Sequence, residues 1–204
     1  MLVLAETNFV LELAFARDAY AACQRIVRLA EERALTLAVP AIAIVEPYFA
    51  LVGRHRRRRA LHQDLQSEIN DLRRSAGYAS LGGAAREALG ILIESTEREN
   101  TSLNEVLARV LSVAELVSVR VSEIEAAVGY QARFGLEPID SVVLASVVSR
   151  LSDLGDDVRF FLNKDAKDFL DPDIQHLLEN LGCELVTDFA TGLERIEAAL
   201  RRSS

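Results

Sequence analysis

Cysteine and histidine are scarce in this chain of 204 residues, which contains two cysteines and three histidines. Cys23 and Cys183 lie far apart in apolar surroundings, so we expect small core residues in a reducing cytoplasm and neither a disulfide framework nor a zinc site. The histidines show no metal-ligand spacing. Tryptophan is absent and aromatic residues make up 6% of the chain, so the sequence gives no sign of a platform for stacking nucleic-acid bases.

Long apolar runs and glycine-rich phosphate loops are also missing. Charged residues interrupt the apolar stretches well before the ~20 residues that a membrane-spanning helix needs, and the first residues lack the basic segment of a signal peptide. We therefore expect a cytoplasmic protein without a membrane partner. The first predicted strand lacks an Asp-x-Asp pattern and none of the strands is followed by a glycine-rich loop, which argues against a phosphotransferase.

The chain does contain short apolar runs in a regular order. Half of its residues are hydrophobic, which is enough for one full core, so we expect a single domain over residues 1–204. Strand-like runs at 2–5, 36–39, 158–162 and 183–187 alternate with amphipathic segments. This order predicts an α/β fold in which helices cover both faces of a short parallel sheet.

The middle of the chain departs from this alternation. Residues 54–118 have helical patterns throughout, and we expect them to form a helical insertion. An apolar stripe within it consists of Leu61, Leu65, Ile69 and Leu72. The stripe either packs on residues 84–117 or pairs with a second copy of the chain to form a homodimer, and the first alternative is favoured.

Helix starts are predicted from capping patterns. Thr7 or Asn8 would cap a helix over about 9–15. Three Ser/Thr-x-x-Glu patterns predict further helix starts, at Ser102, Ser122 and Thr191.

Five acidic residues stand where solvation of a surface does not explain them: Glu6, Glu46, Asp140, Asp165 and Asp168. Glu6 and Asp165 follow predicted strands, and the carboxyl ends of parallel strands meet at one edge of a sheet. Burying a lone carboxylate is costly, and several that converge would make a site for a hard divalent cation. Without a cation, such a cluster would repel itself and raise carboxylate pKa values.

Each acid also has a purely structural explanation. Asp140 suits a helix N-cap, and Asp165 and Asp168 lie in a polar segment that suits a turn. Glu6 could cap the following helix, although its two polar neighbours already offer that. Glu46 is the hardest to explain in this way, because the residues within one helical turn of it are mostly apolar.

Four segments resemble, in order, the motifs of PIN-domain nucleases. They are residues 2–10 with Glu6-Thr7-Asn8, 39–46 with Glu46, 136–145 with Asp140, and 160–169 with Asp165 and Asp168. Together they cover both ends of the chain, roughly residues 1–52 and 136–187. The resemblance implies a three-layer α/β sandwich and metal-dependent hydrolysis of phosphodiester bonds, most often in RNA. Toxins of bacterial toxin–antitoxin pairs are one branch of this family.

The resemblance also implies roles for individual residues. Glu6, Glu46, Asp140 and Asp165 would be catalytic and would bind Mg²⁺ or Mn²⁺, with Asp168 as a further metal ligand or an orienting residue. Asn163, Thr7 and Asn8 would be accessory residues. The cations would orient and activate water and stabilise charge on the leaving oxygen. The implied partners are an RNA substrate and an antitoxin protein.

The chain departs from the family pattern in two ways. The first acid is usually Asp, but here it is Glu6, which is longer by one methylene. The segment between Glu46 and Asp140 is also longer than in compact family members. The first departure, Glu6, favours an alternative function, a catalytically weak PIN-like protein used for binding or assembly.

One basic run stands out in a chain of net charge −8 and pI near 5.0. It contains Arg54, Arg56, Arg57, Arg58 and Arg59. The acidic net charge provides no global attraction to nucleic acid, so any such attraction has to be local. The run either binds the phosphate backbone of RNA or forms a solvated helix face that neutralises the acidic residues downstream, and both interpretations stay open here.

Overall fold

The computed structural model describes all residues except 76, 79–81, 153–157, 165–168 and 204. The predicted ligands Asp165 and Asp168 therefore lie outside the described residues. The elements are β1 (Leu2–Ala5), α1 (Thr7–Ala14), α2 (Tyr20–Glu31), β2 (Thr36–Pro40), α3 (Ala41–Leu72), α4 (Gly82–Val113), β3 (Glu115–Val117), α5 (Val121–Phe134), α6 (Pro138–Ser152), β4 (Arg159–Leu162), α8 (Pro172–Asn180), β5 (Cys183–Val186) and α9 (Phe189–Ser203).

Within the described residues, five strands form one parallel sheet in the order β3-β2-β1-β4-β5. The four strands predicted from apolar runs are confirmed to within one residue at each end. The fifth strand, β3, was not predicted because it has three residues, of which Glu115 and Leu116 are exposed. A short, partly exposed strand at the edge of a sheet lacks the continuous apolar run by which a buried strand is recognised in a sequence.

The sheet separates two apolar cores. Along β1, Val3 and Ala5 face one core, which α2 and α9 cover, while Leu2 and Leu4 face the other, which α6 and α8 cover. Side chains alternate in this way because successive residues of a strand point to opposite faces. Both cysteines are free and buried in these cores, as predicted. The α/β fold with helices on both faces of a parallel sheet is thereby confirmed.

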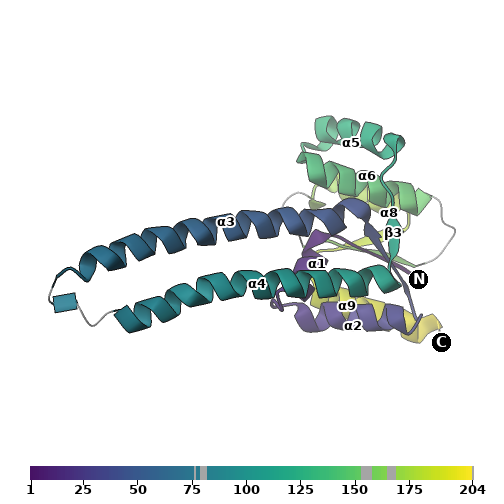
Figure 1. The fold of residues 1–204 in the computed structure, drawn as a ribbon. Coiled ribbons are helices and arrows are strands. Elements are labelled where there is room, and N and C mark those ends of the chain that lie inside the picture. The colour runs from purple at the N-terminus through teal and green to yellow at the C-terminus, as the bar shows by residue number, and fades with distance from the viewer. Residues whose placement is uncertain (76, 79–81, 153–157, 165–168, 204) are drawn as a thin grey trace.

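Two long helices, α3 and α4, run side by side and project well beyond the sheet (Figure 1). We call this pair the hairpin. Helix α3 is continuous from Ala41 to Leu72, so the predicted start of the insertion near residue 54 falls inside a helix. The helical segment ends at Val113, because Glu115–Val117 belongs to the sheet. The division of 1–204 into one domain with an insertion stays a prediction.

The predicted helix start at Ser102 is wrong. Ser102 lies inside α4, and its hydroxyl donates a hydrogen bond to the carbonyl oxygen of Ala14, at 2.6 Å, at the end of α1. A buried cluster beside this contact, formed by Val10, Leu51 and Leu103 with their neighbours, holds α1, α3 and α4 together. A polar residue that resembled a cap therefore makes a tertiary contact at the base of the hairpin.

Two other predicted caps are displaced from the observed helix starts. Helix α5 begins at Val121, where the backbone N–H of Arg120 donates to the carboxylate of Glu123 at 2.8 Å. Helix α9 begins at Phe189, and the carboxylate of Asp188 accepts from the backbone N–H of Thr191 at 2.7 Å. The capping residues are therefore Arg120 and Asp188, in place of the predicted Ser122 and Thr191.

In the part of the chain that the structure describes, none of the helices is both long and apolar enough to cross a membrane.

Candidate active site

Several predicted site residues line one cavity at the carboxyl edge of the sheet. Ala5 of β1 and Leu162 of β4 are partners in the sheet register, so the next residues, Glu6 and Asn163, emerge side by side. Helices α3 and α6 add Glu46 and Asp140. The cavity has a volume of about 90 Å³ and is lined by Glu6, Thr7, Asn8, Leu11, Glu46, Ala50, Asp140, Val143 and Asn163.

Glu6 is almost fully buried, with 6% of its surface exposed. It is the N-cap of α1: one carboxylate oxygen accepts from the backbone N–H of Asn8 at 2.7 Å, and the other accepts from the backbone N–H of Lys164 at 3.3 Å. The prediction that Thr7 or Asn8 caps this helix is therefore wrong. Burial raises the pKa of Glu6 to about 8, the negative charge of Glu46 adds to this rise, and the two backbone hydrogen bonds oppose it.

Glu46 faces the same cavity from the second turn of α3. Its carboxylate accepts a hydrogen bond from the hydroxyl of Thr7, and this contact joins the first turn of α1 to the second turn of α3. Glu46 is half-buried; of the apolar residues around it, Ala43 and Pro47 are buried, whereas Val45, Tyr48 and Phe49 are exposed. The apolar surroundings that distinguished Glu46 in the sequence are therefore only partly buried.

Asp140 lies in the first turn of α6, two residues after the helix begins at Pro138. It is the third residue of the helix and not the N-cap that the sequence suggested. Its side chain is half-buried and borders the cavity. An acidic residue in the first turn of a helix is stabilised by the unsatisfied N–H groups at that end.

The donor atoms at this cavity suit a hard divalent cation. They are the carboxylate oxygens of Glu6, Glu46 and Asp140 and the side-chain amide of Asn163, which is 2% exposed. Each carboxylate oxygen of Glu6 accepts one N–H, which leaves lone pairs for a cation. Among the described residues, which omit 165–168, no group of three or more Asp, Glu, His or Cys side chains is already placed to hold a metal ion.

An ion pair between a buried glutamate and an exposed lysine was not predicted. Glu12, on α1, is 1% exposed; its carboxylate accepts from the ammonium of Lys164 at 2.6 Å and from the backbone N–H of Ala19 at 2.9 Å. The hydrogen bond to Glu12 raises the pKa of Lys164. The pair fixes the start of the segment after β4, whose backbone also binds Glu6. Glu12 gave no signal in the sequence because its partner is far away along the chain.

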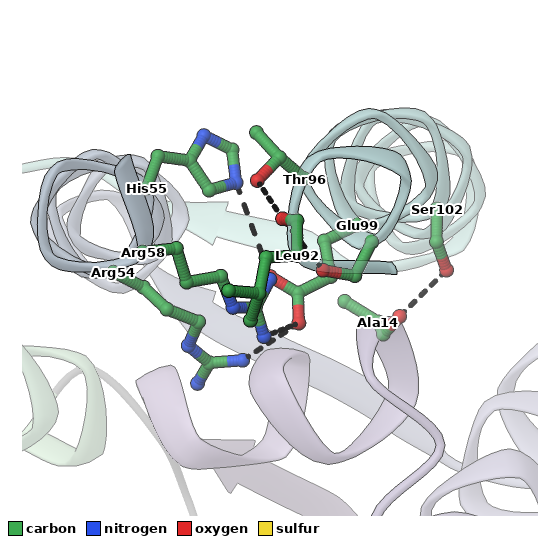
Figure 2. A network of polar contacts seen from close by, with 9 residues as sticks. Ala14, Arg54, His55, Arg58, Leu92, Thr96, Glu99 and Ser102 are labelled. Carbon is green, nitrogen blue, oxygen red and sulfur yellow. Dashed lines mark hydrogen bonds and ion pairs between the residues drawn. The ribbon is translucent and has the colours of Figure 1, made fainter. Parts of the chain in front are cut away.

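The arginines of the basic run differ in their contacts within the chain. Arg54 and Arg58 both donate to the carboxylate of Glu99 on α4, at 3.1 Å and at 2.8–2.9 Å respectively (Figure 2). The guanidinium of Arg54 also lies 4.5 Å from the ring centroid of Phe15. His55 points to the same carboxylate at 3.9 Å, but burial and the nearby arginines lower its pKa, so it is neutral at pH 7. Arg54 and Arg58 therefore hold α3 to α4, whereas His55 makes no hydrogen bond to Glu99.

The remaining arginines of the run, Arg56, Arg57 and Arg59, are exposed. At 3.6 residues per turn, Arg56 and Arg59 fall on the face of α3 that carries Phe49 and Val52, both also exposed. Arg57 falls on a different face, four residues before Leu61. The predicted nucleic-acid-binding set is thus split, and two of its five members already have partners within the chain.

Comparison with solved structures gives a distant match. The crystal structure of VapBC2 from Rickettsia felis bound to a DNA fragment from their promoter is similar over 91% of this chain and 99% of that chain, with 13% sequence identity and a TM-score of 0.45. Neither a protein-family model nor a curated protein matches the sequence. A match at this identity and TM-score gives no information about the function of this chain.

Proposed function

We propose that the protein is a metal-dependent endoribonuclease whose active site is the acidic cavity. One observation carries the proposal: Glu6, Glu46, Asp140 and Asn163, from four separate segments, line the same small cavity at the carboxyl edge of a parallel sheet. Sites in open parallel sheets form at this edge. The order of these residues along the chain also matches the PIN-domain pattern that the sequence resembles.

In this proposal Glu6, Glu46 and Asp140 hold one or two Mg²⁺ or Mn²⁺ ions, and Asp165 and Asp168 are further ligands. Bound cations supply activation of water and stabilisation of charge on the leaving oxygen. The hydroxyl of Thr7 orients Glu46, and the backbone amides of Asn8 and Lys164 orient Glu6. Asn163 contributes a polar side chain that its burial holds in place.

The proposed RNA-binding surface is the exposed face of α3 that begins beside Glu46. Arg56 and Arg59 would bind phosphates, and Phe49, three residues from Glu46, would contact a base. Arg56 follows Phe49 by two helical turns, about 10 Å along the axis, which is within the reach of a few nucleotides. Arg54 and Arg58 are left out of this role because Glu99 binds both of them. An antitoxin partner stays a prediction of the family resemblance.

The test is cleavage of single-stranded RNA in the presence of Mn²⁺ by purified protein, with Asp140→Asn as the variant. We expect at least a ~100-fold loss of cleavage, because removing a residue that stabilises transition-state charge costs a factor of this order. The matched control is Glu137→Gln, an exposed acid three residues earlier, which should cleave like the original protein. Equal cleavage by Asp140→Asn and the control would overturn the assignment, provided that both variants keep the original circular dichroism spectrum.

A second candidate function is binding or assembly without catalysis, and the protonation state of Glu6 favours it. Burial keeps Glu6 largely protonated at pH 7, and protons compete with cations for carboxylates. Calorimetric titration with Mn²⁺ separates the two functions. Saturable binding that Asp140→Asn weakens would support the nuclease, and absence of binding at millimolar Mn²⁺ would support the assembly protein.

A further inference from the structure

Lys164, the second residue after β4, is bound to α1 through both its backbone and its side chain. Its backbone N–H donates to the carboxylate of Glu6 at 3.3 Å, and its ammonium donates to the carboxylate of Glu12 at 2.6 Å. Glu6 is the N-cap of α1, and Glu12 lies six residues further along, which is about 9 Å of helix. Two separate points of α1 therefore hold one residue beside the acidic cavity.

Glu12 is a fixed anchor for the lysine side chain. It is 1% exposed, and a buried carboxylate is stable only when donors pair with it. Its second oxygen accepts from the backbone N–H of Ala19 at 2.9 Å, and Ala19 precedes α2 without a side-chain cap of its own. Because α1 carries Glu12 and the start of α2 binds it, the carboxylate that receives the ammonium of Lys164 is held in place.

The contact from Lys164 to Glu6 is the weaker of the two backbone hydrogen bonds that Glu6 accepts. It measures 3.3 Å, against 2.7 Å for the bond from Asn8, and the usual range for N–H···O bonds ends near 3.2 Å. A long bond depends on an independent contact that keeps its donor in position. The ion pair with Glu12 is such a contact, because it involves the same residue that provides the donor.

We infer that Glu12 and Lys164 are positioning residues of the acidic cavity: the ion pair places the backbone amide of Lys164, and this amide orients the carboxylate of Glu6. Neither residue is among those that line the cavity in the described part of the chain, so both act through Glu6. The inference rests on the proposed function, because it assigns these residues to the same cation site. Loss of contacts that orient a metal ligand lowers metal affinity by roughly 10- to 100-fold.

The first test is calorimetric titration of the full chain with Mn²⁺. The variant carries Glu12→Gln and Lys164→Met together, and we call it the neutral-pair variant. Removing both charges at once avoids a buried carboxylate without its cation, which would strongly destabilise the fold. We expect the dissociation constant for Mn²⁺ to rise by ~10-fold or more. Lys164→Arg keeps a cation for Glu12 and should retain most of the affinity.

The matched control removes a second ion pair that also contains a buried glutamate. Glu123 is 3% exposed and pairs with Arg120, and its other partner, Ser149, lies nine residues along α6 from Asp140, which is about 14 Å. Glu123→Gln with Arg120→Met should therefore leave the affinity for Mn²⁺ unchanged. An equal loss of affinity in the control and the neutral-pair variant would overturn the inference.

A double-mutant cycle with Glu6→Gln separates positioning from a general loosening of the fold. If the ion pair acts through Glu6, adding Glu6→Gln to the neutral-pair variant should weaken Mn²⁺ binding no further than Glu6→Gln alone. A general loosening would add its own effect to that of Glu6→Gln. Additive effects, or a neutral-pair variant with the original affinity when Glu6→Gln has lost it, would overturn the inference.

Hydrogen exchange at the backbone amide of Lys164 tests the positioning without a cation. We expect several-fold faster exchange there in the neutral-pair variant, because the amide loses the anchor that holds it to Glu6. The amide of Asn163, which donates to the carbonyl oxygen of Val186 at 3.0 Å, should keep its protection. Unchanged exchange at Lys164 would overturn the inference. Faster exchange at Lys164, in a protein that binds no Mn²⁺, would instead support the positioning of Glu6 and overturn the proposed function.

Discussion

At the scale of single residues, the hydrogen-bond partners of a buried carboxylate decide the direction in which its pKa shifts. Glu6 and Glu123 are both nearly inaccessible, yet the pKa of Glu6 rises to about 8 while that of Glu123 falls to about 2. The difference lies in their partners. Glu6 accepts backbone amides that do not outweigh burial, whereas Glu123 accepts from the Ser149 hydroxyl and from the backbone and side chain of Arg120. The sequence predicted raised pKa values from repulsion among the acids, but burial is the larger cause.

Glu123 provides a pH-dependent test of the fold. Its folded-state pKa of about 2, chiefly due to the Ser149 hydrogen bond, lies below the ordinary value of 4.5. Its ionised form therefore stabilises the folded protein above pH 4.5, and this contribution is lost as the pH falls towards 2. Glu123→Gln should lower the free energy of unfolding at pH 7, and the difference from the original protein should shrink below pH 4.5.

Urea denaturation at a series of pH values measures this difference. Glu125→Gln, an exposed acid on the same helix, is the control and should have little effect at any pH. If the free energy of unfolding of Glu123→Gln stays below that of the original protein by the same amount from pH 7 down to the pH at which the protein unfolds, the account is contradicted.

At the scale of elements, contact between α9 and the sheet depends on one glycine. A Cβ atom at Gly192 would lie 2.7 Å from a methyl carbon of Leu162, which is fully buried in β4. Gly192→Ala should therefore destabilise the protein by about 1–2 kcal/mol, since overpacking outweighs the gain in helix propensity. Gly129→Ala, on α5, has open space and should stabilise the fold by up to ~1 kcal/mol. Thermal unfolding of both variants tests this, and shifts of the same sign would contradict it.

The hairpin is held at its base by Glu99. Burial alone would raise the pKa of Glu99, but the hydrogen bonds from Arg58 and Arg54 outweigh it and lower the pKa. Glu99→Gln should weaken both contacts and destabilise the base of the hairpin by about 1–3 kcal/mol. Hydrogen exchange should then accelerate in α3 near Arg54 and Arg58, while the exposed Glu97→Gln leaves it unchanged. Equal protection in the two variants would show that the contacts are not stabilising.

Elements were predicted well where the signal is local and poorly where it is not. The four apolar strands follow from continuous runs of buried residues. The predicted helix starts were wrong because Ser102, Ser122 and Thr191 are residue types that often cap helices. The observed caps depend on neighbouring residues and tertiary contacts instead. The continuity of α3 through residue 54 was missed for the same reason. The sequence changes from apolar to basic near residue 54 because α3 leaves the sheet at that point, although the helix continues.

At the scale of the whole molecule, the cavity was predictable because sheet geometry brings distant residues together. The register of β1 with β4 places Glu6 beside Asn163, and α3 and α6 bring Glu46 and Asp140 to the same edge. The Glu12–Lys164 pair and the division of the basic run were not predictable. Both depend on which side chains meet across the fold, and neither leaves a periodic pattern in the sequence. The leucines of α3 were recognised as a stripe in the sequence, but how much of each one stays exposed depends on the packing of α3 against α4.

The central claim is that the acidic cavity binds the catalytic cation, and a crystal soaked in Mn²⁺ tests it most directly. The account predicts an anomalous difference peak inside the cavity, within about 2.5 Å of oxygen atoms of Asp140 and Glu46, that is lost in crystals of Asp140→Asn. A fully soaked crystal that has no peak in the cavity, or a peak that persists unchanged in Asp140→Asn, would contradict the account.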